Sequence, residues 1–114
     1  MSHTAPALDP DIAGQLAEDL PPEVFARIIA TFEADLARLT RELAAAHAAS
    51  DLAGYLAAAH SLAGAAGAVG ATGLESAARI AMDRAQPEAP ATLLPRLERE
   101  AGRALQALRT LLPA

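Results

Sequence analysis

Apolar residues recur along most of this chain at intervals of three and four, the spacing that gathers them on one face of a helix. The longest such stretch predicts a helix from about Glu23 to Ala48. Its apolar face comprises Phe25, Ile28, Ile29, Phe32, Leu36, Leu39 and Leu43. Charged residues such as Arg27 and Arg38 fall away from that face. A long amphipathic helix is therefore expected here.

A short helix is expected before it, over about residues 10–19, with Asp9 as its cap and Pro10 as its first residue. Pro21 and Pro22 cannot continue a helix and so separate the two segments. A third helix is expected to begin near Ser50 and Asp51, which can cap its first turn. Its inward residues are predicted to be Leu52, Tyr55, Leu56, Ala59, Leu62, Ala66 and Val69.

A fourth helix is expected to start at Thr72, because Glu75 follows at the spacing of a capping box. Its inward face is predicted to be Leu74, Ala77, Ala78, Ala81 and Ala85. The segment 86–90 contains two prolines and should break the helix. A fifth helix should run from about Ala91 to Leu111. Its inward residues are predicted to be Leu94, Leu97, Ala101, Leu105 and Leu108.

Short connections between long helices favour antiparallel neighbours. The predicted fold is therefore all-α: an up-and-down antiparallel four-helix bundle with an additional short N-terminal helix. The alanine-rich third and fourth helices should pack closely together. Residues 1–8 are expected to form an N-terminal tail and residues 9–112 a single helical-bundle domain.

Composition narrows the function classes. The 114 residues include 32 alanines and 17 leucines, and the net charge is −5 with no basic cluster, which argues against nucleic acid as a partner. The absence of cysteine excludes disulfides and thiolate zinc sites. No apolar run approaches the roughly 20 residues needed to cross a bilayer, and the first 26 residues lack the charged start of a signal peptide. A soluble, cytoplasmic domain is expected.

The histidines are the main candidates for chemistry. None of His3, His47 and His60 has the spacing of a metal-ligand motif, so no metal site is expected. His3 lies near the terminus. His47 lies at the end of the second predicted helix, where an imidazole suits the last carbonyl groups. A single histidine on a helix is usually a tolerated surface residue, and this is the ordinary interpretation of each of the three.

His60 differs because of its neighbours. On a helical projection it lies roughly 110° from the core direction, on a strip otherwise made of small residues. That strip consists of Ala53, Ala57, Gly64 and Gly67. Each interior glycine costs about 1 kcal/mol relative to alanine. The glycines therefore indicate that something approaches the helix backbone beside His60, although tight helix–helix packing would also explain small residues.

An exposed, unprotonated imidazole nitrogen is a nucleophile near neutral pH. Gly64, one turn beyond His60, would leave room for a group attached to the ring. The small-residue strip would let a partner protein dock flat. An imidazole that accepts and releases a phosphoryl group needs both features, and it needs no nucleotide or metal site of its own if the partner brings them.

The segment 59–71, AHSLAGAAGAVGA, resembles the core signature of histidine-containing phosphotransfer (HPt) domains, roughly H-x-L-K-G-(S/A)-(S/A)-x-x-(aliphatic)-G. The matching residues are His60, Leu62, Gly64, Ala65, Ala66, Val69 and Gly70. Phe32, Asp51-Leu52 and Leu74 also fall where such domains have similar residues. The resemblance covers about residues 9–112.

The resemblance implies a shuttle in a two-component phosphorelay. His60 would be the phospho-accepting nucleophile, taking the group from a receiver-domain aspartyl phosphate and passing it to another receiver. Ala57, Ala63, Gly64 and Gly67 would give phosphoryl clearance and receiver docking. Receiver domains, and a hybrid histidine kinase, would be the partners. The chain would act as a monomer without autonomous kinase activity and with no cofactor of its own, because the receiver would supply Mg²⁺.

One position departs from the family pattern. Ala63 stands where a lysine is usual, three residues after the histidine. Such a cation would help to neutralise the phosphoryl charge. Arg79 and Arg84 in the fourth predicted helix are candidates to replace it, and solvated surface charges are the competing interpretation.

Two other functions stay open on the sequence. The departure at Ala63 keeps a non-catalytic adaptor, which binds receivers without phosphotransfer, as the alternative. A small helical enzyme or di-iron bundle would need inward Glu and Glu-x-x-His patterns, which are absent. A membrane-surface role would need a basic polar face, and the polar faces here are mixed in charge.

Overall fold

The computed structural model describes residues 6–85 and 87–113. In this part of the chain it contains five helices and no strand: α1 (Pro10–Asp19), α2 (Pro22–Ala48), α3 (Leu52–Ala68), α4 (Thr72–Met82) and α5 (Pro90–Thr110). The predicted all-helical fold is confirmed. None of these helices combines the length and the apolarity that crossing a membrane requires. Most of the expected tail, with His3, lies outside the described residues.

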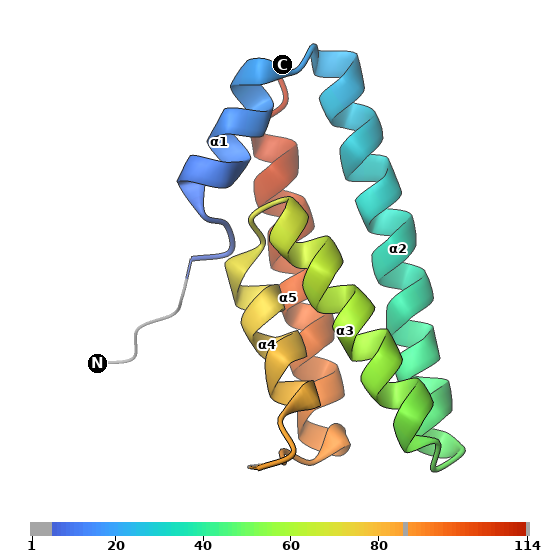
Figure 1. Ribbon diagram of the computed structural model, residues 1–114. Helices are drawn as coiled ribbons and strands as arrows, with labels where there is room; N and C mark the ends of the chain where they lie inside the picture. Colours follow the sequence, from blue (N-terminus) through green and yellow to red (C-terminus); the bar gives the residue numbers. More distant parts are fainter. Residues whose placement is uncertain (1–5, 86, 114) are drawn as a thin grey trace.

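The helices α2 to α5 lie side by side, and each runs opposite to the one before it (Figure 1). Packing joins α2 to α3, α3 to α4, α4 to α5 and α5 back to α2. The four helices thus enclose one continuous hydrophobic core. Helix α1 leans against one end of this bundle, next to the start of α2 (Figure 1).

Large side chains of α2 and α5 fill the core, and small side chains line it where α3 meets α4. On α2 the predicted apolar face is buried except Ile28, which is half-buried. Both α3 and α4 are rich in buried alanines: Ala58, Ala59, Ala63, Ala66, Ala77 and Ala78. On α5 the buried set includes Leu93 and Ala104, which the sequence pattern missed, while Leu94 and Leu105 are only partly buried.

The register of α3 against α4 is set at Gly67. A Cβ atom built on Gly67 would lie 3.3 Å from Oε2 of Glu75. Because the two helices run in opposite directions (Figure 1), residues before Gly67 on α3 lie beside residues after Glu75 on α4. Near the far ends of the two helices, Leu52 and Tyr55 of α3 line one pocket together with Ala81 of α4.

Two left-handed residues end α2 and α3 in the same way. After α2, Ser50 has φ 54°, its N–H donates to the His47 carbonyl (3.1 Å), and the Asp51 N–H donates to the Ala46 carbonyl (2.8 Å). After α3, Gly70 has φ 73° with the equivalent pair of hydrogen bonds. Both are Schellman motifs, which satisfy the last carbonyl groups of a helix and reverse the chain sharply.

The starts of α1 and α3 follow the predicted caps. The Asp9 carboxylate accepts from the Asp11 N–H, and the Asp51 carboxylate accepts from the Gly54 N–H, each at 2.9 Å. The predicted capping box at Thr72 is wrong, although α4 does begin there. The N-cap is Ala71, which has no side-chain acceptor, and the Glu75 carboxylate pairs with Arg79 instead. The Schellman turn at Gly70 places the helix start one residue earlier than the threonine cap requires.

Two predicted inward residues are exposed. Ala85 lies beyond the end of α4, because Asp83 has an extended backbone and its carboxylate accepts from the Ala85 N–H (2.9 Å). Such a local side-chain hydrogen bond competes with helix continuation. Leu52 is 47 % exposed, because it opens α3 at the end of the bundle, where it lines a pocket.

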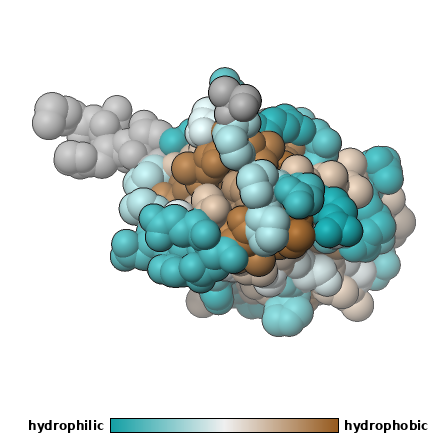
Figure 2. Space-filling view, turned by 90° about the horizontal axis from the view of Figure 1, so that it is seen from above, coloured by the Kyte–Doolittle hydropathy of each residue, from teal (hydrophilic) through white to brown (hydrophobic). Residues whose placement is uncertain are grey.

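The start of helix α1 is hydrogen-bonded to the turn between α3 and α4 and packs against it. The Asp9 N–H donates to the Gly70 carbonyl (2.6 Å), and a Cβ atom on Gly70 would lie 2.9 Å from the Cβ of Ile12. Leu16 and Leu20 of this region pack against the core. Seen from this end, hydrophobic residues gather at the centre of the face with hydrophilic ones around them (Figure 2). Helix α1 therefore packs against this end of the core.

Candidate functional site

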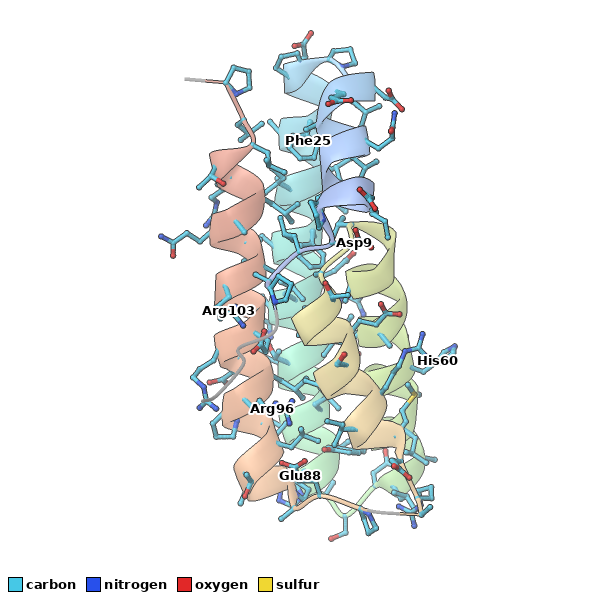
Figure 3. All side chains as sticks on the ribbon, turned by 90° about the vertical axis from the view of Figure 1, so that its left-hand side faces the viewer. Asp9, Phe25, His60, Glu88, Arg96 and Arg103 are labelled. Atoms are coloured by element: carbon cyan, nitrogen blue, oxygen red, sulfur yellow. The ribbon has the colours of Figure 1, made fainter. Side chains whose placement is uncertain are left out.

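His60 occupies the midpoint of α3, on its outward side. The residue is exposed, as the helical projection predicts. Its ring stands at the outer edge of the bundle, about halfway along it (Figure 3). No hydrogen bond or ion pair links His60 to any other described residue. Because no neighbour engages the ring nitrogens, they are available to a molecule arriving from solvent.

The strip around His60 is open on one side of the ring. Ala53, Ala57 and Gly64 are exposed. A Cβ atom on Gly64 would have no heavy atom of a neighbouring group within 4 Å. Gly64 lies one turn beyond His60, so its missing side chain leaves free space next to the imidazole on the same face of the helix.

Gly67 has a different environment. It is half-buried, and the Glu75 carboxylate of α4 lies against its backbone, 3.3 Å from the position of a Cβ atom. A side chain at Gly67 would press on that carboxylate. Gly67 therefore serves the contact between α3 and α4 directly, whereas Gly64 faces open solvent.

Ala63 is 5 % exposed and packs in the core between α3 and α4. An approaching protein can gain almost no contact area from it. The expectation that Ala63 contributes to a docking surface therefore does not agree with its burial. Its small size instead lets α3 and α4 approach closely.

The two candidate cations lie in different surroundings. Arg79 is on α4, and its Nη2 lies 2.7 Å from Oε2 of Glu75, one turn back along the helix. Arg84 follows the end of α4 and lines a pocket of about 290 Å³ at the end of the bundle, together with His47, Asp51 and Tyr55. The sequence offered both arginines as candidate cations without distinguishing them, whereas the structure places them in different surroundings.

A shallow groove of about 550 Å³ runs between α2 and α3, on the other flank of the small-residue strip. Most of its lining residues are small: Glu42, Ala45, Ala46, Ala49, Asp51, Gly54, Ala57, Ala58 and Ser61. Ala57 belongs both to this groove and to the strip beside His60. The exposed imidazole therefore borders a broad surface with few projecting side chains.

The family model of the Hpt domain matches residues 23–113. The chain belongs to the Hpt domain family. This confirms the resemblance found in the segment around His60. Hpt domains are helical bundles of phosphorelays, in which they carry out histidine phosphotransfer and interact with response-regulator receivers. No curated protein matches the chain, and no solved structure does.

As an Hpt domain, the chain has surface features that its sequence pattern did not single out. The α2 side of the groove, with Ala45 and Ala49, was missed, although these alanines sit one turn apart on the polar face of α2. Glu75 was assigned to a cap, and the structure places its carboxylate on α3 instead. Its spacing of four residues before Arg79 was the available signal for an ion pair.

Tyr55 is the one buried polar side chain without a hydrogen bond to a described residue. Tyr55 is also one of the residues that line the pocket at the end of the bundle. Burial, and to a lesser extent the negative charge of Glu88, raises the pKa of the Tyr55 hydroxyl above its ordinary value of 10.0. The hydroxyl is therefore neutral at physiological pH.

The remaining histidine in the described residues lies on another helix. His47 is exposed in the last turn of α2 and lines the pocket at the end of the bundle. Within residues 6–85 and 87–113, no group of three or more His, Asp or Glu side chains is arranged to hold a metal ion. His60 is thus the candidate reactive group of this Hpt domain.

Proposed function

We propose that the protein is a histidine phosphotransfer protein of a two-component phosphorelay. His60 accepts a phosphoryl group from the aspartyl phosphate of one receiver domain and passes it to another. The observation that carries the proposal is the exposed His60, without a hydrogen bond or ion pair to any other described residue and next to the open space at Gly64, in a chain of the Hpt family.

The transfer is a displacement at phosphorus. The lone pair of the unprotonated imidazole nitrogen, which we assign to Nε2, forms the new N–P bond. The acyl O–P bond of the aspartyl phosphate breaks, and the receiver's carboxylate leaves with the electron pair. The ring is left as a phosphorylated imidazolium that still carries its other proton. Because the N–P bond is also a high-energy bond, the same steps can run backwards into a second receiver.

The partner is proposed to supply what the chain lacks. The receiver contributes its acidic residues and Mg²⁺, which neutralise the charge of the transferring group. The Hpt protein contributes the nucleophile and the docking face, with no cofactor of its own and no autonomous kinase activity. We infer that it acts as a monomer, with residues 9–112 as one domain and α2–α5 as an up-and-down four-helix bundle. A hybrid histidine kinase is a further proposed partner.

Docking uses the open side of α3. Ala57 and Gly64 let the receiver approach the helix backbone, and the groove toward α2 extends this face. Large or charged side chains there would hold the aspartyl phosphate away from His60. Small residues, in contrast, let the reacting atoms come within the roughly 3–3.5 Å that an in-line attack needs.

The test is phosphoryl transfer from a panel of phosphorylated receivers in the presence of Mg²⁺. The wild-type chain is expected to acquire an acid-labile, base-stable phosphate from its cognate receiver. His60→Gln should abolish this label, whereas His47→Gln, at the other histidine of the described residues, should leave it unchanged. Labelling of the His60→Gln variant at the wild-type rate would exclude His60 as the acceptor.

A receiver-binding adaptor without chemistry is the second candidate. The observation that favours it is Ala63, which replaces the usual lysine and is buried, so no cation projects from α3 beside His60. An adaptor would bind receivers but acquire no label. Gly64→Arg separates a docking face at His60 from one elsewhere, because it should block binding only if the receiver covers the strip.

A further inference from the structure

The strip around His60 lacks a built-in cation. A phosphoryl group on a side chain carries about −1.5 to −2 charges near neutral pH. Within α3 and α4 the only arginine is Arg79, and there is no lysine. Any charge neutralisation that these two helices provide to a phosphorylated His60 must therefore come from Arg79.

The helix register brings Arg79 toward His60. Starting from the contact of Gly67 with Glu75, His60 lies seven residues along α3, about 10.5 Å, and Arg79 lies four residues along α4, about 6 Å, in the same direction. Because the contact at Gly67 is made by the Glu75 carboxylate, these rises give a direction: from Glu75, Arg79 lies one turn along α4 toward His60. An extended arginine side chain is longer than a helical turn. The imidazole projects outward at the edge of the bundle (Figure 3).

Arg79 is held weakly in its present position. Its side chain is 66 % exposed, and the one ion-pair partner it has among the described residues, Glu75, lies one turn away on the same helix. Ion pairs of this exposed kind contribute little to stability. A phosphoryl dianion offers a stronger, two-pronged partner for a guanidinium than one carboxylate oxygen does. Gly64 and Gly67 present no side chains that would block the guanidinium on its way across α3.

Arg84 does not meet these conditions. It follows the end of α4 and lines the pocket at the end of the bundle. Its neighbours there include Asp51 and Glu88, whose negative charges attract the guanidinium to that pocket. The geometry therefore distinguishes the two arginines.

We propose that Arg79 leaves Glu75 when His60 is phosphorylated and contacts the phosphoryl oxygens, supplying from α4 the positive charge that α3 lacks. This inference rests on the proposed function, since it concerns the phosphorylated state of His60. No further bond is made or broken: the guanidinium exchanges one carboxylate for the phosphoryl group.

The experiment uses phosphoramidate, a small donor that phosphorylates histidine without protein docking, alongside transfer from the cognate receiver. The full chain and its Arg79→Ala, Arg79→Lys and Arg84→Ala variants are compared by NMR of the His60 and His47 imidazole rings. The His47 ring serves as the internal reference. Arg79→Ala is expected to slow phosphorylation of His60 about tenfold, the scale of one charged hydrogen bond. Arg79→Lys should recover most of the rate, and Arg84→Ala should match the wild type.

Three results would overturn the inference that Arg79 contacts the phosphoryl group. Equal rates at His60 for Arg79→Ala and the wild type with phosphoramidate would overturn the inference. A loss confined to the receiver reaction would overturn it too, because Arg79 would then contact the receiver. An equal slowing at His47 would show a general effect of charge and also contradict it. If no receiver labels the wild-type chain, the proposed function fails, while the phosphoramidate comparison still judges Arg79.

Discussion

Two glycines of α3 that look alike in the sequence have different physical roles. Gly64 and Gly67 both interrupt a helix rich in alanine and carry the same propensity cost. Gly64 faces open space, whereas Gly67 accommodates the Glu75 carboxylate of α4. What lies opposite a glycine depends on the packing of another helix, so the sequence of α3 alone could not distinguish the two.

Ser50 provides the residue-scale prediction. It holds φ 54° in the turn after α2, a conformation that costs a residue with a Cβ atom about 1 kcal/mol or more and costs glycine little. Ser50→Gly is therefore expected to raise the free energy of unfolding by about 0.5–1 kcal/mol, after the greater freedom of glycine in the unfolded chain is included. Urea denaturation followed by circular dichroism measures the change.

Ser50→Ala is the matched control, because alanine keeps the Cβ atom and the strain. It should not be more stable than the wild type. A stabilised alanine variant would mean that the serine hydroxyl, and not its backbone conformation, limits stability at this turn.

Whole helices were the most predictable level of structure. Helix α1 begins and ends as its Asp9 cap and the two prolines after it indicate, and α3 begins after Asp51. These boundaries depend on side chains that bond to the nearest backbone atoms, so local sequence specifies them. The end of α4 was missed because an aspartate turn at Asp83 competes with the helix, and the start of α4 lacks its predicted cap because the preceding Schellman turn already fixes the chain.

Helix α1 is expected to depend on its cap more than the other helices do. Removing the carboxylate in Asp9→Ala leaves the Asp11 N–H without its acceptor and should destabilise α1 by about 1 kcal/mol. Since α1 packs mainly against α2 and the turn at Gly70, the loss should stay local. Amide hydrogen exchange is expected to accelerate in α1 and stay unchanged in the centres of α2–α5.

Asp9→Asn keeps a side-chain oxygen at the cap and should restore slow exchange in α1. Equal acceleration through all five helices in Asp9→Ala would instead show that α1 and the bundle unfold as one unit.

At the scale of the whole molecule, the bundle is packed in its middle and has a pocket at one end. His60 lies about halfway along the bundle (Figure 3) and is exposed, whereas Ala59 and Leu62 next to it on α3 are fully buried. At the end with the α2–α3 turn, the pocket is lined by Tyr55, Ala81 and Arg84, among others. His60 therefore stands on the packed middle of the bundle and does not line that pocket.

We expect Tyr55 to set how the free energy of unfolding depends on pH in the alkaline range. The chain has one tyrosine and no lysine or cysteine, so no other side chain has an ordinary pKa close to 10. Burial raises the pKa of Tyr55 in the folded state. Below pH 10 the hydroxyl is neutral in both states and its contribution to stability is fully present. Above pH 10 the unfolded chain loses its proton first, so the free energy of unfolding should fall, by up to about 1.4 kcal/mol per pH unit.

Urea midpoints between pH 8 and 11, with tyrosinate absorbance recorded in parallel, measure this dependence. Tyr55→Phe should remove most of the alkaline decline. At neutral pH it should cost less than about 1 kcal/mol, because the hydroxyl makes no hydrogen bond to a described residue. A decline of the same steepness in Tyr55→Phe would assign the alkaline sensitivity to another group.

The sequence by itself determined the helices, the buried face of α2 and the exposure of His60, because helical periodicity and capping act over a few neighbouring residues. It also carried the motif that identifies the family. Only the tertiary structure decided which residues the helices present to one another: that Ala63 is buried, that Leu52 is exposed, that Glu75 lies on Gly67 and that Arg84, not Arg79, lines the pocket at the end of the bundle. These depend on the register between helices, which is set by packing across the core and has no local signature in the chain.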